Sequence, residues 1–156
     1  MGYGVIESDD DDVSLVDYGA IIPPEKSDIA AHLSHIFREL QNVISRHYPD
    51  VVAVEQPFVA KNVKSAMAIG RAQAIALLAA AEVGIPAYEY TPAQVKQRVA
   101  NYGASSKEQI QEMVRLQLGL SEVPHPDDAA DALAVAICHC REMHVADLLS
   151  SQEDGR

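Results

Sequence analysis

The sequence predicts one α/β domain built on a mixed sheet flanked by helices, and three observations lead to that fold class. Two strand-like segments open the chain, a short apolar run follows an amphipathic helix, and helical and strand patterns then alternate. The 156 residues suit a single domain, which at this size buries roughly 70% of its unfolded surface and needs no disulfide or metal ion for stability. We expect that domain to span residues 1–150, with a flexible tail over 151–156.

The first third of the chain supplies a predicted hairpin, a helix and a buried strand. Residues 1–6 form a strand-like run, and the loosely alternating segment 13–22 pairs with it through an acidic turn. Two prolines end the second strand. Apolar residues at helical spacing predict a helix over 27–48, with Ser27 as its N-cap. The continuous apolar run 51–54 is typical of a central strand buried on both faces.

The rest of the chain alternates between helices and one further strand. An alanine-rich helix is expected to end at Gly84, and Thr91-Pro92 has the residue types of a helix N-cap and first helical position. A second glycine, Gly119, is expected to end another helix. The predicted elements are a helix over 61–83, a strand over 86–90, and helices over 92–100, 105–118 and 127–149.

Composition favours a soluble protein of the cytoplasm. Apolar residues make up 48% of the chain, and no uncharged apolar stretch reaches the roughly 20 residues of a membrane span. No secretory signal is visible, and the two cysteines, Cys138 and Cys140, give no disulfide framework. We therefore expect cytoplasmic localisation and no membrane partner.

The net charge of −11 points away from nucleic acid, because phosphate binding usually leaves a basic footprint. The charge is unevenly placed, however. Residues 61–115 contain seven basic and four acidic residues, a net of +3, while acids gather at Asp9–Asp12 and near the C-terminus. The average therefore hides a basic middle, and composition does not show whether that middle forms one surface.

Glu55 is the first candidate for chemistry. It follows the apolar run 51–54 directly and so lies at the carboxyl end of a strand, where ligands bind in open α/β sheets. An exposed strand end with no further role is the commoner use of such a residue. Glu55 gains weight only if other functional groups converge on it.

Asp128 and Asp131 form the second candidate group. They are three residues apart in a predicted helix and share one face, among alanines that allow close packing. Acids in a first turn also complement the helix dipole, which is their simpler role. If the two aspartates converge with Glu55, the three carboxylates form an oxygen-ligand site for Mg²⁺, with Mn²⁺ as an alternative. Two such ions activate water and stabilise a leaving oxygen in phosphodiester cleavage.

Phe58, Lys96 and Lys107 are candidates for contact with nucleic acid. An aromatic side chain beside an acidic site can stack on a base, although capping the core is its commoner use. Either lysine can meet a phosphate, although a solvated helix face is the commoner place for a single lysine.

The run Cys138-His139-Cys140 resembles a metal motif but favours packing instead. Neighbouring residues on a helix point about 100° apart, so the two sulfurs cannot readily share one ion. His125 is the only histidine near the proposed carboxylate site, where it is a weak candidate for carrying protons.

Five segments, in order along the chain, resemble the RuvC-type Holliday-junction resolvases, which are bacterial endonucleases with a ribonuclease H-like fold. The resemblance runs from Gly2 to about His139. The segments are Gly2-Tyr3-Gly4-Val5-Ile6, Val54 to Asn62, Ser65 to Ala72, Glu89 to Gln97, and Asp128 to Ala134. No single segment is specific, but their ordered combination is.

The resemblance implies metal-dependent nicking of two opposed strands in a four-way DNA junction during recombination and repair. It implies a homodimer that works with the RuvA–RuvB branch-migration complex. Glu55, Asp128 and Asp131 match catalytic carboxylates of the family. Phe58 matches an aromatic implicated in opening the junction, and two lysines near the DNA backbone correspond to Lys96 and Lys107.

One departure from the family pattern concerns the start of the chain. Family members carry an apolar strand ending in Gly-Ile-Asp-Pro-Gly about a dozen residues before Gly-Tyr-Gly-Val-Ile, and this strand holds a further catalytic aspartate. We therefore expect a ribonuclease H-like sheet whose first strand is missing in this chain, with little or no cleavage. A catalytically dead fragment that still binds junction DNA is the alternative. The lack of a phosphate-cradling glycine-rich loop argues against a third class, a small-molecule-binding domain.

Overall fold

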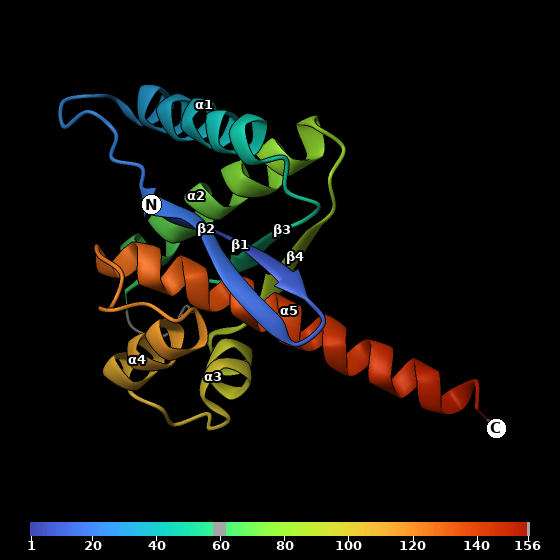
Figure 1. The fold of residues 1–156 in the computed structure, drawn as a ribbon. Helices are drawn as coiled ribbons and strands as arrows, with labels where there is room; N and C mark the ends of the chain where they lie inside the picture. The colour runs from blue at the N-terminus through green and yellow to red at the C-terminus, as the bar shows by residue number, and fades with distance from the viewer. Residues whose placement is uncertain (58–61, 156) are drawn as a thin grey trace.

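The computed structural model describes residues 1–57 and 62–155. Figure 1 shows four layers: α1 with α2, the strands, α5, and finally α3 with α4. The elements are β1 (Gly2–Asp9), β2 (Asp12–Ala20), α1 (Ile29–His47), β3 (Val52–Glu55), α2 (Val63–Glu82), β4 (Ala87–Tyr90), α3 (Pro92–Ala100), α4 (Lys107–Gln117) and α5 (Asp127–Glu153). Strands come first and then alternate with helices, as the sequence predicts.

The opening hairpin is confirmed. Strands β1 and β2 pair antiparallel from Gly2↔Ala20 to Asp9↔Asp12, with a register shift between Val5 and Ile6. Asp10 takes the left-handed conformation, with φ of 52°, that the tight turn requires. The acidic run is therefore the exposed tip of a hairpin, and the first strand ends three residues beyond the predicted 1–6.

The hairpin is held at its tip and on its second strand by histidine–aspartate contacts to two different helices. At the tip, Asp11 lies 3.0 Å from Nε2 of His144 on α5, and its carbonyl accepts a 2.6 Å hydrogen bond from Arg141. On β2, the carboxylate of Asp17 lies 2.8 Å from Nε2 of His47, at the end of α1. The hairpin thus ties the α1 layer to α5.

The sequence predicts a single mixed sheet, but the strands of the described residues form two separate two-stranded sheets. Within residues 1–57 and 62–155, strand β3 pairs with β4 alone, in parallel, from Val52↔Ala87 to Glu55↔Tyr90. Strands β1 and β3 face one another across a groove instead of exchanging hydrogen bonds. For the same reason only Val54 of β3 is fully buried, where burial of the whole run was expected.

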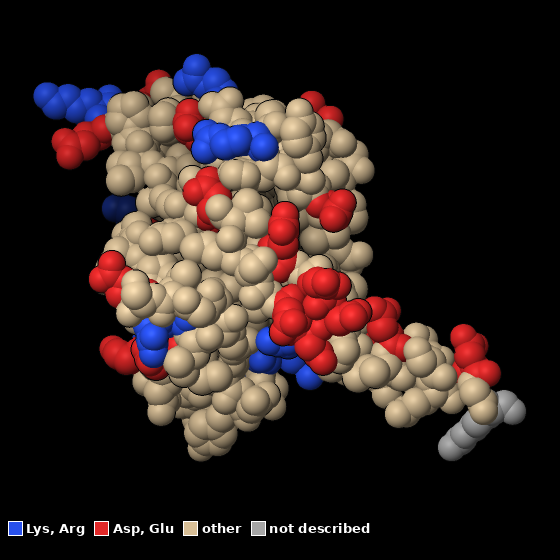
Figure 2. All heavy atoms as spheres, viewed as in Figure 1, with Lys and Arg blue, Asp and Glu red and all other residues tan. Residues whose placement is uncertain are grey.

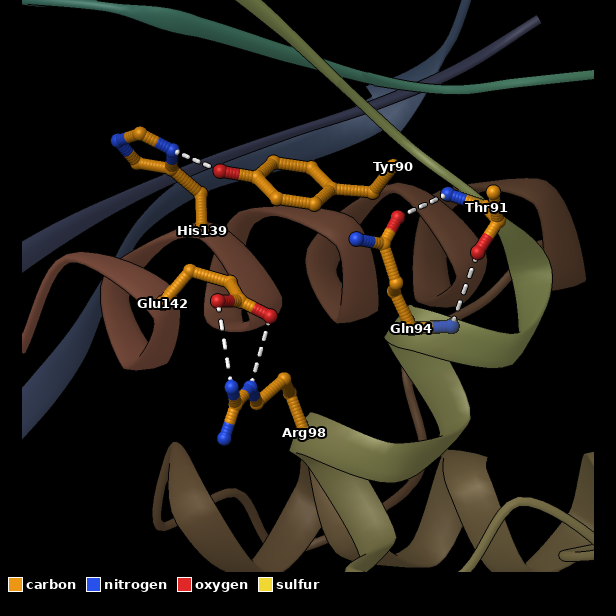
Figure 3. Close-up of polar contacts among 6 residues, drawn as sticks. All are labelled: Tyr90, Thr91, Gln94, Arg98, His139 and Glu142. Atoms are coloured by element: carbon orange, nitrogen blue, oxygen red, sulfur yellow. Dashed lines mark hydrogen bonds and ion pairs between the residues drawn. The ribbon is translucent and has the colours of Figure 1, made fainter. Parts of the chain in front are cut away.

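The helices begin and end close to their predicted positions. Thr91 and Gln94 form the capping box that opens α3, seen in Figure 3, and Ser106 with Gln109 forms another at α4. Asp28, rather than Ser27, is the N-cap of α1, because its carboxylate accepts the amide of Ala31. Left-handed Gly84 and Gly119 follow α2 and α4. Helix α5 continues to Glu153 and so includes the first three residues of the segment 151–156. The flexibility of that segment stays a prediction.

The main core lies between β4, α3, α4 and the middle of α5. Its most deeply buried members include Val99, Val114, Leu133 and Ile137. Helix α5 is central because it contacts both pairs of strands as well as α3 and α4. Its N-terminal turn is thereby fixed beside the end of β3, which places the candidate site.

Candidate active site

Glu55 is the last residue of β3 and lies opposite Tyr90 in the parallel register. The pairing continues one step further, where the amide of Gln56 donates to the carbonyl of Tyr90 over 2.7 Å. The backbone at Glu55 is therefore fixed on the β4 side, and its half-buried side chain is presented at the carboxyl end of the parallel pair. This is the position that the sequence predicts for it.

The first turns of α5 carry three aspartates, Asp127, Asp128 and Asp131. The residue before the helix is Pro126, and no side chain caps the first turn, so its free amides leave a partial positive charge there. Asp127 and Asp128 are exposed and Asp131 is half-buried. The helix terminus therefore offers local electrostatic compensation to the acids that it presents.

A single open cleft brings the predicted carboxylates together. Glu55, Asp128 and Asp131 all line a cavity of about 500 Å³ whose other walls come from the start of β1, α1 and α2. Residues 73 positions apart, Glu55 and Asp128, thus share one site because β3 and α5 pack side by side. The three carboxylates therefore meet in one cleft, as the sequence analysis proposes. Their chemical role stays a prediction.

Burial and mutual repulsion raise the pKa of two of these carboxylates. Desolvation is the main cause at Glu55, the negative charge of Asp131 raises its pKa further, and Lys96 opposes the shift. Desolvation also dominates at Asp131, where Lys107 lowers the pKa while Asp128 and Asp127 raise it. The cleft therefore holds more negative charge than its own lysines neutralise.

Lys107, at the start of α4, bridges the aspartates of α5. Its ammonium lies 3.4 Å from Asp127 Oδ2 and 3.7 Å from Asp131 Oδ2. The negative charge of Asp131 is the main cause that raises the pKa of Lys107, and Asp127 adds to it. Lys96 lies near enough to Glu55 to influence its pKa. The structure thus places both predicted lysines beside the acidic cleft.

The carboxylates do not form a ready-made metal cage. Across residues 1–57 and 62–155, no three His, Cys, Asp or Glu side chains are gathered closely enough to hold one ion. They line a common cleft at a wider spacing. Phe58, the predicted base-stacking residue, lies outside the described residues. The expectation that His125 is the only histidine near the site is wrong, because His125 is exposed and does not line the cleft, whereas His32 of α1 does.

A buried polar pair that sequence reasoning missed lies behind the cleft. The hydroxyl of Tyr90 and Nδ1 of His139 share a 2.7 Å hydrogen bond (Figure 3). Tyr88 packs on the same imidazole, with ring centroids 4.7 Å apart. Burial lowers the pKa of His139 and raises that of Tyr90 to about 12. His139 and Cys138 are both buried, in agreement with the packing role predicted for the Cys-His-Cys run.

A second missed contact joins α3 to α5. Nε and Nη2 of Arg98 donate to the two carboxylate oxygens of Glu142 over 2.8 and 3.3 Å (Figure 3). The partners are 44 residues apart. No local pattern connects them, so only the packing of α3 on α5 reveals the pair.

Two glycines allow β1 to lie directly on α5 next to the site. A Cβ atom at Gly2 would come within 2.0 Å of the carbonyl oxygen of Asp128, and one at Gly4 within 2.5 Å of Leu133 Cδ2. The close approach of strand to helix therefore requires glycine at both positions. The pattern Gly2-Tyr3-Gly4 was the only signal of this contact in the sequence.

Comparison with known proteins agrees with this arrangement. The model of the family described as crossover junction endodeoxyribonuclease RuvC matches residues 1–139, which include every carboxylate of the cleft. The chain belongs to the RuvC family. The resemblance inferred from the five sequence segments is thereby confirmed.

Close relatives span nearly the whole chain. The crossover junction endodeoxyribonuclease RuvC of Dehalococcoides mccartyi is 54% identical over 150 residues, covering 96% of this chain and 91% of the relative. That of Chloroflexus aggregans is 52% identical over 139 residues, covering 89% and 85%. The structure of Thermus thermophilus RuvC shares 34% identity and a TM-score of 0.84, covering 93% of this chain and 89% of that one. The same RuvC in complex with a Holliday junction substrate gives a TM-score of 0.86.

These matches bear on two expectations from the sequence. The ribonuclease H-like α/β fold is confirmed by the likeness to the Thermus structures. The expectation of a missing first strand with loss of activity gains no support, because the family model matches from residue 1 and the chain covers about nine-tenths of its Dehalococcoides relative.

Proposed function

We propose that this chain is a Holliday-junction resolvase that nicks opposed strands of four-way DNA junctions by metal-dependent phosphodiester hydrolysis, in recombination and repair. The observation that carries the proposal is the shared cleft of Glu55, Asp128 and Asp131 in a chain of the RuvC family. The Thermus relative of the same fold was solved with a Holliday junction substrate.

The donor set fits a hard divalent cation. All three side chains offer carboxylate oxygens, the ligands that Mg²⁺ prefers, and Mn²⁺ accepts the same set. Burial first, and neighbouring carboxylates second, raise the pKa of Glu55 and of Asp131, and a bound cation would favour the ionised form of both. We assign Glu55, Asp128 and Asp131 as the ligands. When bound, the metal would activate water and stabilise the leaving oxygen.

The protein's own part is to hold these groups in position. Pairing with β4 orients the backbone of Glu55, and the long helix α5 carries both aspartates on one face. Lys107 offsets part of the repulsion between Asp131 and its acidic neighbours in the metal-free protein. A bound cation would compete with this ammonium for the same oxygens, and Lys107 would then be available to a phosphate of the substrate.

Contact with DNA is assigned to Lys96, Lys107 and Phe58. The two lysines lie beside the cleft, on α3 and at the start of α4. Two other basic residues of the segment 61–115 form salt bridges, Arg98 with Glu142 and Arg115 with Glu112. The basic middle is thus partly neutralised, and its DNA-binding part is concentrated at the cleft.

A homodimer is the assembly that α2 favours. Val63, Met67, Ala74 and Leu78 share one face of this helix, and all four are exposed. Length and composition would also allow α2 to span a membrane, which by itself is a weak indication. Covering this stripe with a second copy removes apolar surface from water and places two clefts in one particle, as two opposed nicks require.

Size-exclusion chromatography with light scattering tests the dimer. We expect a dimer for the native chain and a monomer for Leu78→Glu, with Glu82→Lys, an exposed change in the last turn of α2, as the matched control. A native chain that is monomeric at every concentration would refute this assembly. Functional coupling to a RuvA–RuvB branch-migration complex is part of the same proposal, and its test is stimulation of nicking by that complex.

The decisive assay is nicking of a synthetic four-way junction in Mg²⁺ or Mn²⁺, with linear duplex of the same sequence as competitor. We expect paired nicks in opposed strands and their loss in Glu55→Gln and Asp128→Asn. Asp147→Asn removes an exposed carboxylate from the same helix far from the cleft and should cut normally.

Failure to cut, together with a salt-dependent preference for junction over duplex in a gel shift, would identify a binding protein without nuclease activity. Failure in both assays would overturn the proposal. Retained cutting in Asp128→Asn would remove that residue from the metal site.

A further inference from the structure

Tyr90, the last residue of β4, is bound both to β3 and to α5. Its carbonyl accepts the amide of Gln56, the residue after Glu55, over 2.7 Å. Its hydroxyl shares the 2.7 Å hydrogen bond with Nδ1 of His139 on α5, seen in Figure 3. In the part of the chain that the structure describes, this is the only hydrogen bond that joins β3 and β4 to α5. One residue therefore connects the two elements that carry the carboxylates of the cleft.

Burial fixes the direction of this hydrogen bond. The side chains of Tyr90 and His139 belong to residues that are only 5% and 8% exposed. Burial raises the pKa of Tyr90 to about 12, so the hydroxyl keeps its proton and donates it. Burial also lowers the pKa of His139, so the imidazole is neutral at pH 7 and its Nδ1 accepts. Removing one partner would leave the other as a buried polar group without a hydrogen bond, which is costly.

The contact lies on the side of α5 that carries the aspartates of the cleft. His139 follows Asp128 by about three turns and Asp131 by about two, so the three side chains share one side of the helix. Glu55 and Tyr90 are partners in the parallel register, and their side chains therefore leave the sheet on the same face, toward α5. The hydrogen bond thus fixes the end of β3 against the helix that presents the aspartates.

We propose that Tyr90 and His139 are positioning residues, which hold Glu55 at the separation from the two aspartates that Mg²⁺ requires. The inference rests on the proposed function, because it takes the three carboxylates of the cleft as metal ligands. These carboxylates are spaced more widely than a metal cage, so the position of β3 on α5 decides whether they meet on one ion. Mg²⁺ demands near-ideal octahedral geometry, whereas Ca²⁺ accepts flexible sets of oxygens. A positioning defect therefore weakens Mg²⁺ binding more than Ca²⁺ binding.

Titration calorimetry with Mg²⁺ or Ca²⁺ alone tests this role without DNA. Tyr90→Phe keeps the ring and removes the hydroxyl, and we expect Mg²⁺ binding to weaken about tenfold and Ca²⁺ binding by less than about threefold. Tyr88→Phe is the matched control, because it removes a hydroxyl from a ring that packs on the same imidazole, and it should leave both affinities unchanged. His139→Asn supplies a carbonyl oxygen near the place of Nδ1 and should keep most of the Mg²⁺ affinity.

Amide exchange shows whether the defect is local. In Tyr90→Phe we expect the Gln56 amide, which donates to the carbonyl of residue 90, to exchange about fivefold faster or more. The Val52 amide donates to the carbonyl of Pro86 over 2.9 Å, at the other end of the same strand pair, and should exchange as in the native chain. Equal acceleration at both amides would indicate a general loss of stability and would overturn the positioning role.

The nicking assay adds a kinetic criterion. Tyr90→Phe should lower kcat about tenfold with little change in KM, because the contacts with the junction remain. Unchanged Mg²⁺ affinity in Tyr90→Phe, or equal losses for Mg²⁺ and Ca²⁺, would overturn the proposal. A native chain that binds Mg²⁺ but never cuts DNA would refute the proposed function alone, since calorimetry would still decide the role of Tyr90. A native chain that binds neither cation would overturn both.

Discussion

Substitution of Gly4 by alanine tests the contact that positions β1 on α5. The added Cβ would meet Leu133 Cδ2 at 2.5 Å and Leu133 Cγ at 2.7 Å. Carbon atoms in contact prefer about 3.5–4.0 Å, so either the strand or the leucine must move by about 1 Å. Leu133 is fully buried in the main core, which leaves it little room to yield.

The expected cost follows from two opposing effects. Overpacking a tight core contact costs about 1–3 kcal/mol. Replacing glycine by alanine restricts the unfolded chain, which returns about 0.4–1 kcal/mol. The net loss is about 1–2 kcal/mol, and in a chain of this size that lowers Tm by about 2–8 °C. Gly70→Ala is the control, because among residues 1–57 and 62–155 its Cβ would meet Pro57 alone, at 4.0 Å; it should stabilise α2 by about 0.5–1 kcal/mol.

Thermal and urea unfolding of a double-mutant cycle gives the decisive measurement. Leu133→Ala alone should cost about 3–5 kcal/mol, because it leaves a cavity. The double variant Gly4→Ala/Leu133→Ala should lose at least about 1 kcal/mol less than the sum of the single variants, since the new methyl enters the vacated space. Additive losses, or a Gly4→Ala protein as stable as the native one, would refute close packing of β1 on α5.

Three further predictions concern charge and buried polar groups. Glu55→Gln and Asp131→Asn should each abolish nicking yet raise Tm at pH 7 in chelator, because a raised folded-state pKa disfavours the ionised carboxylate. The gain in Tm should shrink as the pH falls through the raised pKa, because the native carboxylate is then protonated as well. A Tm of either variant below that of the native chain at pH 7 would contradict the raised pKa. The lowered pKa of His139 implies stability that is complete above the unfolded value of about 6.5 and is lost as the pH falls below it. His139→Gln should flatten urea midpoints between pH 7 and 5.5, whereas His35→Gln should not. Arg98→Lys keeps the charge but loses the paired hydrogen bonds to Glu142, and should cost about 0.5–1 kcal/mol by urea unfolding; an unchanged midpoint would show that the pair contributes nothing.

Local patterns predicted most of the secondary structure because the forces that set it are local. Thr91-Pro92 indicated the start of α3, since an N-cap hydroxyl and a proline at the first helical position act within one turn. Ser27 was a wrong choice of N-cap beside Asp28, because both residue types cap well and only the geometry separates them. The apolar run 51–54 predicted β3 but not the incomplete burial that follows from its open edge.

The candidate site was predictable only in part. Position after an apolar strand singled out Glu55, and three-residue spacing joined Asp128 to Asp131, while the relation between the two groups depended on packing. The ammonium of Lys107 bridging Asp127 and Asp131 could not be foreseen, since α4 and α5 meet only in the folded chain. The hydrogen bond of Tyr90 to His139 was hidden for the same reason, with 49 residues between its partners.

The opening hairpin keeps the acids of its tip away from the acids of the cleft. Its first strand begins beside the carboxylate cleft at Gly2 and ends at the acidic tip at Asp9, about 23 Å away along the strand. Acid side chains gather over that tip, near α5, in Figure 2. Because the Debye length is about 8 Å in physiological salt, the tip exerts little repulsion at the cleft. It instead repels a polyanion that arrives from its own end, so the acidic tip affects the direction of approach more than occupancy of the cleft.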